Sequence, residues 1–327
     1  MKKLLVTAMM MMMAQAEDKI ALTEIGRFSA DPAYTGCVAI KGKVAFSGGP
    51  YGMDSWDIRN PRVPKQLCHL DLWNADDIVI RGPLAYVETV GYINGVRVSG
   101  FAIVDISHPK QMSVLGWYDQ NSNSSQLEVR GKYLYLADYA SGLVIVDVSD
   151  PADPRFVGQY DPYTESSDWV LDVKVRGHYA YLACGYHGME VVDISNPAAP
   201  ELVGVYDGGH WGYAFRVEIK GQFALLGNLG TGLDVVNISD PAMPYLVGNW
   251  EDGSVWSTVL SNGLLFIVDY SDQDPGVKGL DLSDPSNPNP VCQFSADGGR
   301  GVAVEGNILL FAGNQGVSVL KIQRRKE

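Results

Sequence analysis

The stretch Leu143–Pro151 reads LVIVDVSDP: four consecutive apolar residues, an aspartate, and a second aspartate just before a proline. A short run of Val, Ile and Leu that ends in turn residues is typical of a strand buried on both faces. Pro151 has no amide hydrogen to donate, so it is expected outside the ladder. The stretch therefore predicts a buried strand followed by a tight turn that the aspartates hold through their side-chain oxygens.

Related segments recur along the whole chain. They are SWDIRNP (55–61), IVDISHP (103–109), VVDISNP (191–197), VVNISDP (235–241), GLDLSDP (279–285) and a final partial copy, SVLKI (318–322). A second marker, a short apolar run ending in a turn glycine, occurs at Gly42, Gly82, Gly131, Gly177, Gly221, Gly263 and Gly306. Both markers count seven, so the chain is predicted to contain seven repeats of roughly 44 residues.

Each repeat contains four short strand candidates separated by glycine or proline. In the third repeat they are residues 127–130, 133–137, 143–148 and 155–160. Four antiparallel strands per repeat predict an all-β fold, a seven-bladed β-propeller of four-stranded antiparallel blades.

The two ends of the chain indicate how the ring closes. Residues 22–29 match fourth strands such as residues 202–207, whereas the last repeat stops after its third strand at Ile322. We expect the N-terminal strand to complete the last blade, beside residues 317–322, and so to remove the free sheet edges. The alternative, an open solenoid, requires capping repeats, and none is visible.

The segments at 101–105, 143–147 and 189–193, each followed by Ser-Asp-Pro, Ser-Asn-Pro or Ser-His-Pro, resemble the LVIVD repeat. The resemblance extends over nearly all of the chain after residue 16, with the first, sixth and seventh copies divergent. It implies an exported or cell-surface propeller protein of bacteria or archaea. It implies no settled activity and no set of catalytic residues.

The N-terminus has the order of a secretory signal peptide. Lys2 and Lys3 precede the apolar run Leu4–Met13, and Ala14-Gln15-Ala16 follows. We therefore predict a signal peptide over residues 1–16, a single propeller domain over 17–327, and a periplasmic, extracellular or cell-surface location. The alternative is a buried N-terminal helix. The apolar run is too short to cross a bilayer comfortably and no other long apolar stretch exists, so no membrane span is expected.

Composition narrows the range of partners. The chain carries 25 Lys+Arg against 38 Asp+Glu, a net charge of −13, which repels phosphate backbones and argues against nucleic acid. With 46% hydrophobic and 19% charged residues, it has enough apolar material for a large core. The cysteines are widely and irregularly spaced, so most are expected to be unpaired: Cys37, Cys68, Cys184 and Cys292.

Aromatic residues gather in the connections that share one face of a propeller. These connections join the fourth strand of one repeat to the first strand of the next, or the second strand of a repeat to its third. The candidate ligand-binding residues in connections of the first kind are Trp169, Trp211, Tyr213 and Trp256, and those in connections of the second kind are Asp138, Tyr186 and His187. Aromatic planes beside carboxylates suit sugar rings or peptide side chains. The alternative is that each tryptophan packs between blades.

Along the first strand of each repeat, apolar side chains alternate with a mixed set that includes polar ones. Because successive side chains point to opposite sides of a strand, the polar set forms a row of its own, and we expect this polar row to face the central channel. Its charged members on adjacent repeats are Asp172, Lys174, Arg216 and Glu218. These residues either pair with one another or, in the case of Asp172 and Arg216, anchor a ligand.

Motifs of known catalytic sites are absent from the sequence, including Gly-x-Ser-x-Gly and His-Glu-x-x-His. No cofactor is expected. The segment Asp272-Gln273-Asp274 could bind a calcium ion weakly, yet it lacks the further oxygen ligands that this ion requires. The sequence favours a non-catalytic recognition or scaffold module that binds an extracellular or periplasmic protein, peptide or glycan through its loop face and channel mouth. The alternative is a glycan hydrolase or lyase whose carboxylates converge at that mouth.

Overall fold

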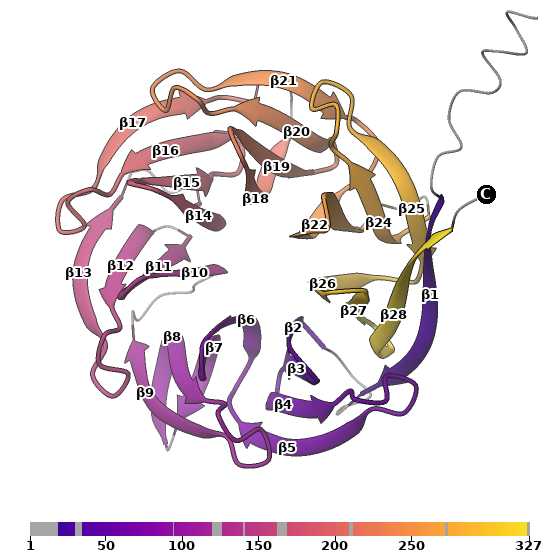
Figure 1. Ribbon diagram of the computed structural model, residues 1–327. Helices are drawn as coiled ribbons and strands as arrows, with labels where there is room; N and C mark the ends of the chain where they lie inside the picture. The colour runs from indigo at the N-terminus through magenta and orange to yellow at the C-terminus, as the bar shows by residue number, and fades with distance from the viewer. Residues whose placement is uncertain are drawn as a thin grey trace, which may run out of the picture.

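The computed structural model describes residues 19–29, 35–93, 95–119, 126–139, 141–161, 169–208, 212–271 and 274–325. Seven sheets stand around a central axis, and each sheet has four antiparallel strands ordered from the axis outward (Figure 1). The predicted seven-bladed β-propeller is therefore confirmed. The predicted signal peptide lies outside the described residues and stays a prediction.

Blades 1 to 6 follow one another along the chain. Blade 1 has β2 (Cys37–Lys41), β3 (Val44–Gly49), β4 (Gly52–Asp57) and β5 (Lys65–Asp71); blade 2 has β6 (Ala75–Arg81), β7 (Leu84–Ile93), β8 (Val96–Asp105) and β9 (Ser113–Asp119). Blade 3 has β10 (Gln126–Arg130), β11 (Tyr133–Asp138), β12 (Gly142–Asp147) and β13 (Arg155–Tyr160); blade 4 has β14 (Asp172–Arg176), β15 (Tyr179–Ala183), β16 (Met189–Asp193) and β17 (Glu201–Tyr206). Blade 5 has β18 (Tyr213–Lys220), β19 (Phe223–Leu229), β20 (Gly232–Asn237) and β21 (Tyr245–Trp250); blade 6 has β22 (Val255–Ser261), β23 (Leu264–Asp269), β24 (Gly276–Asp281) and β25 (Asn289–Ser295).

Blade 7 joins the two ends of the chain. It consists of β26 (Gly299–Glu305), β27 (Ile308–Gly313), β28 (Gly316–Arg325) and, outermost, β1 (Lys19–Phe28). Leu22 lies opposite Ile322 and Phe28 opposite Val317, and Figure 1 shows β1 in indigo beside β28 in yellow. The closure predicted from the two chain ends is confirmed.

The core lies between adjacent blades rather than at one centre. On β12, Val144 and Val146 pack toward blade 2, while Leu143 and Ile145 pack toward blade 4. All four side chains are fully buried. An uninterrupted apolar run is therefore required here, because both faces of each sheet are covered.

The repeated aspartate holds the turn that follows the third strand. Asp147 Oδ1 accepts the amide of Ser149 at 2.9 Å. The same bond joins Asp57 to Arg59, Asp105 to Ser107, Asp193 to Ser195, Asn237 to Ser239 and Asp281 to Ser283. The predicted structural role of this position is confirmed in every blade that has the complete turn.

A glycine in the fourth strand contacts the proline turn of the next blade. A Cβ atom at Gly158 would lie 2.2 Å from the carbonyl oxygen of Pro197, and one at Gly204 would lie 2.2 Å from that of Pro241. Gly26, Gly116 and Gly248 meet the next blade's turn in the same way. Sequence spacing gives no indication of this role for the glycines, because the contact joins residues of different repeats.

The cysteines are unpaired, at positions Cys37, Cys68, Cys184 and Cys292. Burial, the largest effect, raises the pKa of the Cys37 thiol well above its ordinary value, and nearby carboxylates such as Asp77 add to it. The thiol donates a hydrogen bond to the carbonyl oxygen of Ala75 at 3.4 Å. Cys37 is thus a packed residue with little thiolate character.

Candidate functional site

A cavity of about 290 Å³ lies at the mouth of the central channel. The first strands of the blades surround the axis (Figure 1) and supply most of its wall. The principal side chains that line it are those of Asp76, Asp77, Glu88, Gln126, Glu128, Tyr139, Lys174, Phe215, Arg216, Trp256, Thr258 and Arg300. The polar row predicted to face the channel supplies Lys174 and Arg216. Asp77, Gln126 and Glu128 occupy the matching positions of neighbouring first strands and also line the cavity, so the alternation correctly identified part of this wall.

Four β-bulges supply further residues of the wall. In blades 2, 5, 6 and 7, the first strand skips one residue in its pairing with the second strand: Asp76, Phe215, Trp256 and Arg300. All four unpaired residues line the cavity. A bulge turns a side chain away from the regular two-residue alternation, and bulges are frequent beside functional sites. Asp76, Phe215 and Arg300 were missed from the sequence because the alternation rule fails at a bulge.

Arg216 is buried beside the cavity, and no carboxylate of the described residues pairs with it. Its side chain is 8% exposed, its guanidinium stacks 4.1 Å from the ring of Phe215, and its Nη1 donates to the Phe215 carbonyl oxygen at 2.9 Å. Within the described ranges, no carboxylate lies within ion-pair distance of it. Burial, the largest effect, lowers the pKa of Arg216, and the more distant Asp172 and Asp77 only partly oppose that shift.

Asp172 ties two blades together and does not line the cavity. It is 1% exposed, and its oxygens accept the amides of Val173 at 2.8 Å and of Val217 in the next blade at 3.0 Å. Asp77 makes the same connection to Leu127 at 3.0 Å. Burial raises the pKa of Asp77 to about 6. The ligand-anchoring role considered for Asp172 therefore competes with a clear structural one.

Lys174, which lines the cavity, lies between two carboxylates. Its Nζ is 3.7 Å from Asp172 and 3.9 Å from Glu218. Burial disfavours the ammonium, but Asp172 and Glu218 outweigh it and raise the pKa of Lys174 well above its ordinary value. Burial raises the pKa of Glu218 to about 7, although Lys174 acts in the opposite direction. Three of the four residues of the predicted charge network thus interact directly, and Arg216 stands outside these contacts.

The raised pKa of Glu218 predicts a pH-dependent stability. Between pH 4.5 and 7 the folded protein holds a proton that the unfolded chain has released, so this group's contribution to stability is full below pH 4.5 and is lost as the pH rises through 7. The variant Glu218→Gln mimics the protonated side chain. Its thermal midpoint is expected to match that of the wild type near pH 4.5 and to exceed it by a few degrees at pH 8, measured by circular dichroism.

The control for this prediction is Glu201→Gln, which removes one exposed carboxylate at the start of β17. A difference between Glu218→Gln and the wild type that stays constant from pH 4.5 to pH 8 would contradict the prediction.

The aromatic candidates belong to three clusters of contacting side chains along one face. Trp256 lies 4.8 Å from Phe215 and 5.5 Å from Tyr270, measured between ring centroids. The guanidinium of Arg300 lies 5.2 Å from the Trp256 ring. Trp169 meets Tyr139 edge-on at 5.5 Å, and Tyr186 meets Tyr213 edge-on at 4.9 Å.

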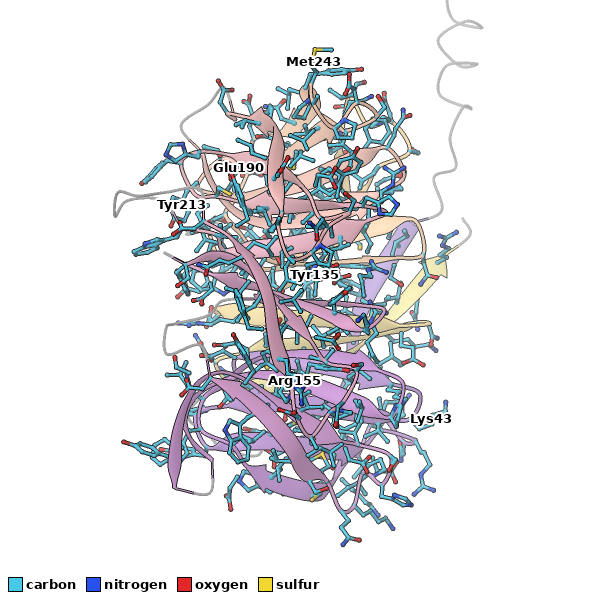
Figure 2. The ribbon with its side chains drawn as sticks, turned by 90° about the vertical axis from the view of Figure 1, so that its left-hand side faces the viewer. Lys43, Tyr135, Arg155, Glu190, Tyr213 and Met243 are labelled. Atoms are coloured by element: carbon cyan, nitrogen blue, oxygen red, sulfur yellow. The ribbon has the colours of Figure 1, made fainter. Side chains whose placement is uncertain are left out.

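Backbone bonds between blades hold this face in position. The amide of Val170 donates to the Tyr139 carbonyl oxygen, and Gly185 and Ala214 exchange two hydrogen bonds. Figure 2, a side view, shows Tyr213 on one face of the disc and Lys43 on the opposite face. The name "aromatic face" is used below for the side that carries Tyr139, Trp169, Tyr186, Tyr213 and Trp256.

The predicted site residues differ in their access to solvent. Tyr186 is 71% and Trp169 43% exposed, and His187 is also exposed. Asp138 is fully buried at the end of β11, so a ligand on the surface cannot reach its carboxylate. Trp211 lies outside the described residues. Of the nine predicted residues, Arg216 and Trp256 line the cavity.

The described ranges contain no cluster of three or more His, Cys, Asp or Glu side chains suited to a metal ion. Asp272 and Gln273, considered for calcium, lie outside those ranges. The described residues also include no helix long and apolar enough to cross a membrane.

Solved structures with the same fold are numerous and distant in sequence. The β-propeller domain of Cps50 (Swd1) from Myceliophteria thermophila is 12% identical with a TM-score of 0.68, and covers 91% of this chain and 99% of its own. The WD40 propeller domain of Doa1 is 9% identical with a TM-score of 0.70, covering 93% and 98%. Sqt1 of Saccharomyces cerevisiae is 10% identical with a TM-score of 0.64, covering 93% and 100%.

Fold and site together define a seven-bladed β-propeller with a ligand-sized cavity at its channel mouth. No curated protein matches the sequence. The family model of the LVIVD repeat matches residues 74–120, 122–162, 170–208 and 211–252, more than half of the chain. The chain belongs to the LVIVD-repeat family.

Proposed function

We propose that this protein is an exported, non-catalytic recognition propeller that binds a protein, peptide or glycan at the aromatic face and inserts a small group of that partner into the cavity. The observation that carries the proposal is the set of four bulges, which direct Asp76, Phe215, Trp256 and Arg300 toward one space. Each bulge gives up regular pairing, and a bulge at the same place in four blades favours a ligand site over chance.

The size and chemistry of the cavity support recognition of a terminal group. A cavity of about 290 Å³ lies at the small end of ligand sites. It suits one sugar ring or one peptide side chain, while the aromatic face outside it offers contact area for the rest of the partner. Export rests on the predicted signal peptide, and the acidic net charge disfavours nucleic acid.

One observation favours the second candidate, a glycan hydrolase or lyase. Asp76 and Asp77 both line the cavity, and burial is the largest cause of the raised pKa of each carboxyl. A carboxyl that keeps its proton near pH 6 can act as a general acid. Asp77, however, also accepts backbone amides of Leu127 and Ile78, which gives it a structural task.

The test is capture of partners on glycan and peptide arrays. Trp256→Ala is expected to weaken capture at least about tenfold, because an aromatic residue at the centre of a binding site contributes more than about 1.4 kcal/mol. Trp73→Ala is the matched control, since Trp73 is an exposed tryptophan that does not line the cavity.

Capture that is equal for wild type and Trp256→Ala would argue against the proposed site. Turnover of a bound glycan that disappears in Asp76→Asn, with binding retained, would favour the enzyme.

A further inference from the structure

The charged side chains around the cavity differ in how many of their hydrogen-bonding groups have a partner. Asp77 accepts two backbone amides, Asp76 accepts the Nδ2 of Asn74 at 2.5 Å, and Glu128 pairs with the Nε of Arg130 at 2.6 Å. Arg216 donates only to the carbonyl oxygen of its own neighbour, Phe215, among the contacts of the described residues. A guanidinium carries five N–H donors, so most of its donor capacity is left for another acceptor.

The position of Arg216 directs that capacity toward the cavity. The guanidinium stacks on Phe215, and that ring lines the cavity as a bulged residue. Stacking covers a face of the guanidinium and leaves its edge, where the N–H groups lie, for a planar acceptor. Arg216 is 8% exposed, so its guanidinium is poorly hydrated. An anion that binds it displaces few water molecules and can form charge-assisted hydrogen bonds with its N–H groups.

We propose that Arg216 binds the carboxylate of a small ligand group whose other polar atoms are hydrogen-bond donors. This inference rests on the proposed recognition function and specifies the chemistry of the group that enters the cavity. A carboxylate matches the two-pronged geometry of a guanidinium edge.

The charges of the remaining wall explain why a single carboxylate fits better than a phosphate. The four carboxyl groups of Asp76, Asp77, Glu88 and Glu128 outnumber the two cations, Lys174 and Arg300, that line the same cavity besides Arg216. A dianion would therefore meet stronger repulsion there than a monoanion. These four carboxyl groups offer acceptor oxygens for hydroxyl or ammonium groups of the ligand. An acidic sugar and a peptide C-terminus share this chemistry.

The experiment measures affinity by isothermal titration calorimetry for matched pairs of probes. D-glucuronate is compared with D-glucose, and glycylglycine with glycylglycine amide, while inorganic phosphate tests the alternative anion. At least one carboxylate probe is expected to bind about tenfold or more tightly than its neutral counterpart, and the pair that shows this difference identifies the source. Arg216→Met is expected to remove that advantage, and Arg216→Lys to retain part of it.

The matched control is Arg155→Met, which removes an exposed arginine at the start of β13 that pairs with Asp153. This variant should bind like the wild type. Without ligand, Arg216→Met should keep or raise the thermal midpoint, because a buried charge without an ion-pair partner is replaced by an apolar chain of similar length.

Three results would overturn the inference. They are tighter binding of phosphate, equal binding of charged and neutral probes, and no binding of any probe. A marked fall in the midpoint of Arg216→Met would do the same, because it would show a structural role for the guanidinium. None of these results affects the array test with Trp256→Ala, so the carboxylate inference can fail while the recognition function stands.

Discussion

Deleting residues 1–28 is expected to abolish cooperative folding of the ring. The deletion removes β1, whose pairing with β28 runs from Lys19–Arg325 to Phe28–Val317. It also removes Phe28, a buried residue whose ring centroid lies 4.5 Å from that of Trp56 in blade 1. The free energy of unfolding lost with these contacts is comparable to the whole stability of a typical domain, about 5–15 kcal/mol. The deletion also exposes the edge of β28 to pairing with other chains.

The measurement is chemical unfolding followed by circular dichroism, together with size-exclusion chromatography for aggregates. Deleting only residues 1–18 is the control and should leave the unfolding transition unchanged, because β1 remains. A synthetic peptide of residues 19–28 should restore the transition of the longer deletion by mass action. A longer deletion that is monomeric and unfolds at the wild-type denaturant concentration would disprove the role of β1 in closure.

Gly158→Ala and Gly204→Ala should each destabilise the fold by about 3 kcal/mol, the upper part of the range for overpacking. In both cases the new methyl group would lie 2.2 Å from a proline carbonyl oxygen of the following blade. That neighbour is backbone, held by the Asp193 turn in one case and by the Asn237 turn in the other, so it cannot move aside as a flexible side chain would.

Blade 6 provides the control for the glycine prediction. In the fourth strand of this blade, Cys292 occupies the position that Gly158 and Gly204 have in blades 3 and 4. The next blade, blade 7, has no Ser-Asp-Pro turn to meet it, because its two outer strands come from opposite ends of the chain. Cys292→Ala therefore keeps a Cβ atom where one is already accommodated, and its cost should stay below about 1.5 kcal/mol. Equal losses for Gly158→Ala and Cys292→Ala in urea unfolding would contradict the contact with the turn.

Local pattern accounts for most of the architecture. The apolar runs and the turn glycines recur in all seven repeats, and the Asp or Asn turn that follows the third strand recurs in the first six. Their spacing alone predicted seven blades. The Asp147 turn illustrates why this succeeded: donor and acceptor are two residues apart, so sequence spacing is enough to place them. The same reasoning explains why β1 was correctly placed beside β28, since an unfinished last repeat and an unmatched first strand require each other.

Contacts between repeats were harder to foresee. Tyr160 of blade 3 donates its hydroxyl to Glu190 of blade 4 at 3.1 Å, and Tyr206 of blade 4 donates to Asp234 of blade 5 at 3.3 Å. Asp172 looked like a channel residue, yet its oxygens accept backbone amides of two blades. In each case the partner belongs to another repeat, and its relative position depends on how the blades stack.

The strand order within a blade, the turn chemistry and the alternation that directs Arg216 toward the channel each depend on residues within one repeat, and the blade count follows from the number of repeats. All four could therefore be read from the residues alone. The composition of the cavity could be read only from the folded ring. Asp76, Phe215, Trp256 and Arg300 leave the alternation at bulges, and they come from four blades that meet around one axis when the ring is closed. The physical reason is that a bulge and a contact between blades are set by packing across the whole ring, whereas a strand or a turn is set by its immediate neighbours.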